Sequence, residues 1–298
     1  MKNLHKIHSY IYRNRNVRNN SIITLKSNKM EDSYDHIDSS LIYVPESIPG
    51  VDCPDSFHEE FLEGCRCNSK SNCIDPSHCS CLKGTEPLYD ENSRITWPLP
   101  LYPMFECNSK CSCKAECKNS VIMKGPIKNL YLQKISNEKG LGVFCQNKIF
   151  KGSFICTYSG EIIGIDEGLK RTKEQQDKRK SNYILFVKEY FSTESVSTVI
   201  DPTIIGNIGR YLNHSCDPNL VMMPVRVQNM VPHIALFACI DIPCGTELTY
   251  DYGNTSTDRN IVQANFNDAL LTPDERTKLV KCLCGSKNCC KKYLPYHR

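Results

Sequence analysis

The sequence has few of the features that mark membrane or secreted proteins. No stretch of its 298 residues approaches the roughly 18 consecutive apolar residues that a membrane span needs. The first 30 residues also lack the apolar segment of a secretory signal. Because 40% of the residues are hydrophobic, the chain can still bury a substantial core. We therefore expect a soluble, folded protein in a compartment that does not favour disulfides.

Each sign of charge is missing from one part of the N-terminal region. Residues 1–30 contain seven Lys or Arg and no acid, whereas residues 31–65 contain ten acids and no Lys or Arg. A basic segment of this kind is typical of a disordered tail. The alternatives are nucleic-acid contact, nuclear import and a mitochondrial presequence. We expect residues 1–40 to form a basic, disordered tail, with DNA contact as a candidate role.

Tryptophan occurs once, but cysteine occurs 19 times. Cysteines two residues apart are poorly placed to form a disulfide with each other, whereas both thiolates can bind one metal ion. Zinc is the metal that such soft ligands favour. Nine cysteines fall into two blocks that each contain Cys-x-Cys pairs, and they are Cys65, Cys67, Cys73, Cys79, Cys81, Cys107, Cys111, Cys113 and Cys117.

The number of these cysteines matches a cluster of three zinc ions. Three tetrahedral ions need twelve coordination positions, and nine thiolates supply twelve if three of them each bridge two ions. The segment has little periodic apolar patterning, so metal binding would supply most of its folding energy. We predict a structural zinc module over residues 41–120. Cys53 lies outside the pattern and is interpreted as a buried or free thiol.

A second zinc site is predicted near the C-terminus. Cys282, Cys284 and Cys289 leave a tetrahedral zinc ion one ligand short. Cys216 could complete the site and would attach the chain end to the middle of the main domain. The alternative ligand is Cys290, whose position next to Cys289 is geometrically awkward. We expect this module at residues 282–298, after a polar linker at residues 254–281.

The segment from 121 to 253 has a different pattern. One polar stretch, residues 166–180, is compatible with a solvated helix. The remainder consists of short β-type runs separated by Gly, Pro and Asn turns. These runs are residues 141–145, 152–158, 182–187, 197–201 and 233–240. We therefore predict a mainly β domain with one helix on its surface.

Several motifs follow the nine-cysteine block in a fixed order. They are KGLGVF at 139–144, YSGE at 158–161, RYLNHSCDPN at 210–219, ELTYDYG at 247–253 and CLCGSKNC at 282–289. Over about residues 50–296 the chain resembles the SET-domain histone lysine methyltransferases of the Suv39-like class. This resemblance implies a SET-domain β-clip fold with a pseudoknot, flanked by a tri-zinc pre-SET module and a one-zinc post-SET module. It also implies the cofactor S-adenosylmethionine and a place in the nucleus, on the chromosome.

The resemblance assigns roles to individual residues. Tyr158 and Tyr252 would orient the lysine amine in a narrow channel, and Tyr250 would limit the number of methyl groups. The family commonly has Trp where this chain has Leu141, so we expect weaker cofactor binding. The implied cofactor-binding residues are Lys139, Gly140, Leu141, Gly142, Tyr183, Arg210, Asn213 and His214.

The implied substrate is the histone H3 tail or the nucleosome. The hydroxyl of Tyr250 would retain a water beside the amine, which favours mono- or dimethylation. Lysine 36 is slightly favoured over lysine 9. Similar members of the class carry a transposase portion that this sequence lacks, so we expect no DNA-end activity. The alternatives are a catalytically weak or inactive zinc-stabilised chromatin-binding scaffold and a basic nucleic-acid-binding zinc protein.

Overall fold

The computed structural model describes only part of the chain. Most of the predicted basic tail and of the predicted linker lies outside the described residues, as does Cys290. Among the described residues, no helix is long and apolar enough to cross a membrane. The described residues are 37–61, 63–67, 73–82, 85–100, 102–113, 117–178, 180–191, 194–252, 279–287, 289 and 293–295.

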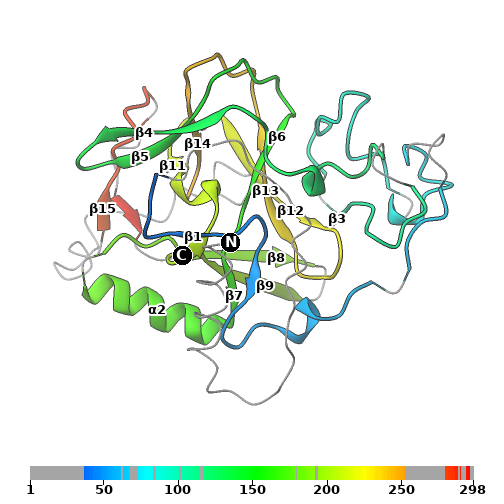
Figure 1. Cartoon of the computed structure of the whole chain (residues 1–298), viewed down its shortest axis with the longest axis horizontal. Helices are drawn as coiled ribbons and strands as arrows, with labels where there is room; N and C mark the ends of the chain where they lie inside the picture. The colour runs from blue at the N-terminus through cyan, green and yellow to red at the C-terminus, as the bar shows by residue number, and fades with distance from the viewer. Residues whose placement is uncertain are drawn as a thin grey trace.

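The fold is mainly β, as predicted (Figure 1). The short strands are β1 (Ile42–Tyr43), β2 (Ile48–Pro49), β3 (Met104–Phe105), β7 (Glu161–Ile163), β10 (Ile205–Gly206), β11 (Asn213–His214), β15 (Leu279–Lys281) and β16 (Tyr293–Pro295). The longer ones are β4 (Leu130–Ser136), β5 (Gly140–Cys145), β6 (Phe154–Tyr158), β8 (Leu185–Tyr190), β9 (Ser195–Asp201), β12 (Leu220–Arg226), β13 (His233–Ala238) and β14 (Glu247–Tyr250). Single 3-10 turns are η1 (Asp55–Phe57), η2 (Ser80–Leu82), η3 (Ile122–Lys124) and η4 (Ile208–Tyr211).

Three four-stranded sheets surround the main core. Their strand orders are β11-β14-β5-β4, β3-β12-β13-β6 and β2-β7-β9-β8. Strand β13 is the most deeply buried, and residues 234–238 have no exposed surface. Each predicted β-type run contributes to one of these strands, although β8 begins at Leu185, two residues after Tyr183. Tyr183 therefore lies in the loop before the strand.

Helix α2 (Ile165–Asp177) is the predicted helix, and it is the only α-helix within the described ranges. Asp166 and Glu167 in its first turn favour the helix dipole. Arg171 fixes the helix to the sheet below it, because its Nη1 atom lies 2.8 Å from Asp201 and 2.9 Å from Glu161. The helix is thus held on the outer face of the β2-β7-β9-β8 sheet.

The chain crosses itself near the ends of β11 and β14. These strands are parallel neighbours, with Asn213 opposite Thr249. The side chain of Asn219 then donates to the Glu247 carbonyl at 2.8 Å and accepts from the Thr249 amide at 2.9 Å. Parallel pairing over so few residues needs such side-chain bonds because the ladder is too short to hold itself. Two motifs that are distant in sequence are therefore held side by side.

The cysteine-rich region packs beside these sheets with little regular structure (Figure 1). It joins the main domain where β3 pairs with β12. Next to this strand, the buried carboxylate of Glu106 accepts hydrogen bonds from the Tyr89 hydroxyl and from the Val121 and Ile122 amides. Burial raises the pKa of Glu106, although these bonds oppose the shift. This carboxyl group connects the two regions.

Candidate active site and zinc clusters

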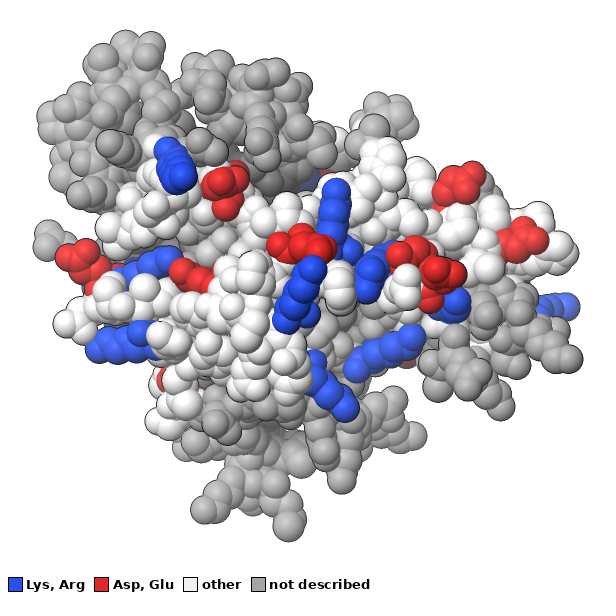
Figure 2. Space-filling view, turned by 90° about the horizontal axis from the view of Figure 1, so that it is seen from above, with Lys and Arg blue, Asp and Glu red and all other residues white. Residues whose placement is uncertain are grey.

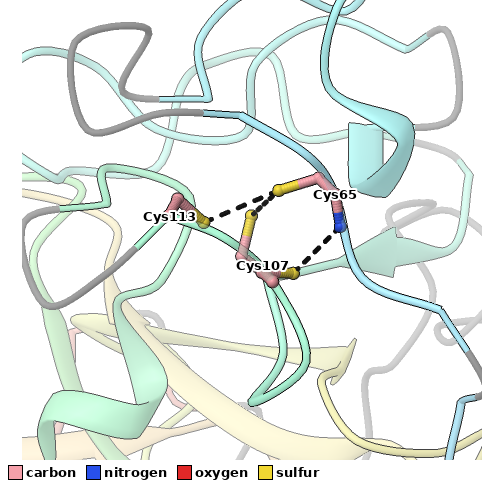
Figure 3. A group of neighbouring side chains, drawn as sticks. Cys65, Cys107 and Cys113 are labelled. Carbon is pink, nitrogen blue, oxygen red and sulfur yellow. Dashed lines mark hydrogen bonds between the residues drawn. The ribbon is translucent and has the colours of Figure 1, made fainter.

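The nine predicted cysteines form one buried cluster. The Cys65 sulfur lies 3.8 Å from the Cys107 sulfur and 3.6 Å from the Cys113 sulfur (Figure 3). Sulfur atoms bound to one tetrahedral zinc at about 2.3 Å lie about 3.8 Å apart, whereas a disulfide needs about 2.05 Å. The spacing therefore fits zinc ligands and not disulfides.

Three groups of four sulfurs can be distinguished in this cluster. In each group all sulfurs lie within 4.8 Å of one another. The groups are Cys65, Cys107, Cys111 and Cys113; Cys65, Cys73, Cys79 and Cys107; and Cys73, Cys107, Cys113 and Cys117. Shared sulfurs are what bridging thiolates require, so the cluster could hold zinc, and the number of ions stays a prediction.

Two predicted ligands lie outside these groups but within the cluster. The Cys81 sulfur is 3.5 Å from the Cys111 sulfur. Cys67 is buried among the same thiols, and its sulfur lies 3.7 Å from the carbonyl of His78. The structure thus brings all nine predicted ligands together.

The second group of thiols contains Cys216, as the sequence indicated. Its sulfur lies 3.8 Å from that of Cys282, and Cys289 is 3.7 Å from Cys282. With Cys284, the four sulfurs lie within 4.8 Å of one another. The alternative ligand, Cys290, lies outside the described residues. This group could hold one zinc ion and would fix the chain end beside His214, whose Nε2 atom is 3.3 Å from the Cys216 sulfur.

Three tyrosines meet at the ends of strands β6 and β14. The Tyr250 ring centroid lies 4.8 Å from that of Tyr252 and 6.4 Å from that of Tyr158. Tyr158 and Tyr250 are buried, whereas Tyr252 is 43% exposed. The Tyr158 hydroxyl donates to the Tyr183 carbonyl at 2.6 Å, and the Tyr252 hydroxyl donates to the Leu212 carbonyl at 2.7 Å. The three rings form an aromatic wall that leads from the surface into the core.

The buried phenols of this wall are neutral. Burial raises the pKa of Tyr158 and of Tyr250 well above the usual value, and the neighbouring tyrosine hydroxyls add to the effect. A neutral phenol can donate and accept hydrogen bonds, but it does not remove protons near neutral pH. These residues are therefore suited to orient a substrate and not to act as a base.

The predicted cofactor residues of two motifs meet through Glu247. This carboxylate lies 2.7 Å from the Lys139 amine and accepts from the Asn213 side chain at 2.9 Å. Asn213 also donates to the Leu141 carbonyl at 3.0 Å. Sequence reasoning did not single out Glu247, although it begins the ELTYDYG motif. It connects strand β5 to the parallel pair β11-β14.

The two glycines of β5 differ in their surroundings. Gly140 has a φ of +75°, a conformation that glycine adopts without the strain of a Cβ atom. A Cβ on Gly142 would lie 2.6 Å from the Ile135 side chain and 3.2 Å from the Asn213 amide nitrogen. Leu141, between them, is half-buried and packs against the main core. The strand is thus open beside Gly140, whereas neighbouring side chains lie directly against Gly142.

Arg210 and Tyr183 lie against each other next to the tyrosine wall. The guanidinium carbon is 4.1 Å from the centroid of the Tyr183 ring. The Arg210 side chain is buried, and its Nε atom makes no hydrogen bond to the described part of the chain. A buried guanidinium that keeps one unpaired N–H beside an aromatic wall fits a ligand that carries both a carboxylate and a sulfonium. S-adenosylmethionine is such a ligand.

His214 is held in a fixed orientation. Its Nδ1 atom accepts from the Tyr252 amide at 3.2 Å. Burial lowers the pKa of His214, although the nearby charge of Asp251 opposes the shift. With Nδ1 bonded to the Tyr252 amide and Nε2 beside the Cys216 sulfur, the imidazole connects the ELTYDYG motif to the C-terminal thiols.

Comparison with known proteins identifies the family. Residues 140–253 match the SET domain family, and residues 13–120 match the Pre-SET motif. The methyltransferase SETMAR from Bos taurus is 38% identical over 262 residues, which cover 85% of this chain and 81% of that protein. Human SETMAR is 39% identical, and the match covers 36% of its length. The probable methyltransferase set-23 from Caenorhabditis briggsae is 40% identical over 250 residues, covering 83% of this chain and 92% of that protein.

The fold agrees with these relatives. The crystal structure of the methyltransferase domain of human SETMAR superposes with a TM-score of 0.71 at 34% identity and covers 88% of this chain and 91% of that one. The resemblance inferred from the motifs is therefore confirmed, and within its class the chain is similar to SETMAR. The chain belongs to the SET-domain histone-lysine N-methyltransferases of the Suv39 class.

Proposed function

We propose that this protein transfers a methyl group from S-adenosylmethionine to a lysine of histone H3. The observation that carries the proposal is the wall formed by Tyr158, Tyr250 and Tyr252, which leads inward to the buried Arg210. A neighbour of 26% identity and TM-score 0.61, KRYPTONITE, has been solved with an H3(1–15) peptide, DNA and S-adenosylhomocysteine. That complex supports the choice of cofactor and of substrate.

The cofactor would be held by three parts of the site. Arg210 and Tyr183 would bind its amino-acid end, and the backbone at Asn213 and His214 would hold its adenine. Gly140 allows close approach, because no atom lies within 4 Å of its Cβ position. Lys139, Leu141 and Gly142 complete the surface. When bound, S-adenosylmethionine would supply a sulfonium methyl group whose carbon a neutral amine can attack, with S-adenosylhomocysteine as the leaving group.

The tyrosine wall would prepare the lysine for this reaction. A free lysine amine has a pKa of about 10.4, so most of it is protonated at neutral pH. An aromatic channel with little water disfavours the charged amine and lowers this pKa. The Tyr158 and Tyr252 hydroxyls would then orient the neutral amine and contact the methyl group through their oxygens, which reduces the entropic cost of alignment.

The proposed degree of methylation rests on Tyr250, and the proposed target lysine rests on the similarity to relatives. The Tyr250 hydroxyl would retain a water beside the amine, which leaves room for mono- or dimethylation. We propose lysine 36 of histone H3 on the basis of the similarity to SETMAR. Lysine 9 is the alternative, since the H3(1–15) peptide bound by KRYPTONITE spans it.

The zinc clusters would serve a structural role. We propose three ions in the pre-SET cluster and one in the post-SET group, which together stabilise segments that have little core of their own. The modules would span residues 41–120, 121–253 and 282–298. The relatives support a place in the nucleus on chromatin.

A direct role in DNA binding finds little support on one face of the described surface. Figure 2 shows Lys and Arg interspersed with Asp and Glu there, without a continuous basic patch. The basic tail, where DNA contact was predicted, lies outside the described residues. DNA contact through this tail stays a prediction.

Mass spectrometry of H3 peptides tests the proposed function. Peptides that span lysine 9 or lysine 36 are incubated with S-adenosylmethionine and either wild-type protein or Tyr252→Phe. We expect one or two methyl groups, mainly at lysine 36, with wild type and a strong loss with the variant. Trimethylation as the main product would contradict the role of Tyr250. No methylation of peptides or nucleosomes would favour the scaffold alternative.

A further inference from the structure

Asp38 lies outside every motif described above, yet it forms an ion pair with Arg210, one of the predicted cofactor-binding residues. Asp38 lies 172 positions before Arg210 in the sequence, yet its Oδ2 atom accepts from the Arg210 guanidinium at 3.1 Å. The same oxygen accepts from the Tyr211 hydroxyl at 2.9 Å. The Arg210 side chain is 7% exposed and that of Asp38 is 25% exposed, so this ion pair is partly buried. A partly buried pair is screened less by salt than a surface pair.

The segment that carries Asp38 is attached to the main domain through the residues that follow the pair. The other carboxylate oxygen, Oδ1, accepts from the Ser40 amide at 3.0 Å and from its hydroxyl. Strand β1 then pairs in parallel with β10. Val44 next packs with Ile48 and the fully buried Ile205. The segment 38–44 therefore lies along the main domain as a strap, fixed by backbone pairing and a small apolar cluster.

Contacts continue from this strap to the tyrosine wall. Asp38 holds one terminal nitrogen of Arg210, and the guanidinium lies over the Tyr183 ring at 4.1 Å. The Tyr183 carbonyl accepts the hydrogen bond of the Tyr158 hydroxyl. The Arg210 Nε atom is left for another partner. The orientation of Arg210 thus depends on a carboxylate outside the SET motifs.

We propose that Asp38 is a positioning residue that orients Arg210 for cofactor binding, so that the strap 38–44 is part of the cofactor site. This inference rests on the proposed function, because it uses the role of Arg210 toward S-adenosylmethionine. Asp38 does not contact the reacting atoms. Without its carboxylate, the buried guanidinium would lose its fixed partner and would have to be ordered when the cofactor binds, which weakens binding.

The test compares three variants of the full-length, zinc-loaded protein. Asp38→Asn keeps the shape and removes the charge, and Asp38→Glu restores a carboxylate on a longer side chain. Asp55→Asn is the matched control, because Asp55 is exposed in the same N-terminal region and its side chain makes no hydrogen bond or ion pair to the described residues. Calorimetry measures the dissociation constant of S-adenosylhomocysteine, and steady-state kinetics give KM for S-adenosylmethionine and kcat separately.

We expect Asp38→Asn to weaken cofactor binding about tenfold, which is the usual effect of losing a charged hydrogen bond. KM for S-adenosylmethionine should rise with it, whereas KM for the H3 peptide should not change. Asp38→Glu should recover part of the loss, and Asp55→Asn should match wild type. A structural role alone would shift the unfolding transition without this selective change in KM.

Three results would overturn the inference, and they can be distinguished. If wild type binds the cofactor and methylates the peptide but Asp38→Asn binds equally well, the inference fails and the proposed function stands. If wild type binds no cofactor, both fail. Equal losses for Asp38→Asn and Asp55→Asn would show a general effect of charge, and they too would overturn the specific role of Asp38.

Discussion

The cysteine-rich region and the SET domain are stabilised in different ways. Nine thiols form the cluster of the first region, and between Cys65 and Cys117 the described regular structure is limited to η2 and β3. In the second, strand β13 and its neighbours bury a continuous apolar core that includes Ile234 and Leu236. Metal binding can replace an apolar core when few residues are available to build one. The two regions should therefore respond to different perturbations.

Zinc removal should have the largest effect and should act on one region first. Structural zinc sites contribute about 10–16 kcal/mol of apparent binding energy, so a chelator should unfold the two segments that carry the nine cysteines, around 65–81 and 107–117. Hydrogen exchange should show loss of protection there before any change in β13. Chelator saturated with zinc beforehand is the control. Simultaneous loss of protection in both regions would show that they are not stabilised independently.

A cavity in the apolar core should destabilise the SET domain and leave the zinc cluster unchanged. Ile234→Ala removes a side chain with no exposed surface and should lower the free energy of unfolding by about 2–5 kcal/mol. The matched change Ile240→Ala, at a residue that is 53% exposed, should cost little. Denaturant unfolding measures both. The zinc content of the folded variants should equal that of wild type, and lost zinc would argue against independent stabilisation.

Removal of one post-SET ligand should affect the post-SET zinc site and leave the nine-cysteine cluster intact. Cys216→Ser should lower the zinc content by one ion, because the other three thiols lack a fourth partner among the described residues. Activity should fall about tenfold, since second-sphere and ligand changes typically cost 10–100-fold. Elemental analysis and peptide methylation measure the two effects. Cys244→Ser, at an exposed thiol outside both clusters, is the control.

The smallest effect concerns the carboxyl group that joins the regions. Burial raises the folded-state pKa of Glu106, so its contribution to stability is fully present below its unfolded pKa and is lost as the pH rises through the folded value. Glu106→Gln should remove this dependence. The difference in unfolding free energy between variant and wild type should therefore change in favour of the variant as the pH rises above about 4.5. A difference that is constant with pH would refute this account.

Local patterns predicted many of the elements correctly. The polar stretch at 166–180 became helix α2, and the β-type runs became parts of β5, β6, β8, β9 and β13. Alternation and turn residues are local signals, so they can be read from a short window of sequence. The two-residue strands β1 and β10 leave no such signal, because their pairing depends on a neighbour more than 160 positions away.

In the candidate site, too, residues in local motifs were predicted, whereas residues that depend on a distant partner were not. The tyrosines and the Asn213-His214 pair were found because they lie in recognisable motifs. Glu247 was not singled out, and neither was Asp38, because an acidic residue becomes informative only when its partner is known. Glu247 contacts Lys139 and Asn213, and Asp38 contacts Arg210, and these contacts are seen only in the folded chain.

The sequence by itself determined the chemistry that this chain can offer. Cysteine spacing indicated metal ligands, and the ordered motifs indicated a SET-domain methyltransferase, because these properties depend on residue type and short-range spacing. Only the tertiary structure decided how the nine thiols of the first cluster divide into groups and that Asp38 reaches Arg210. Such contacts depend on how the chain crosses itself, and the many ways of closing long loops differ too little in free energy for local patterns to choose among them.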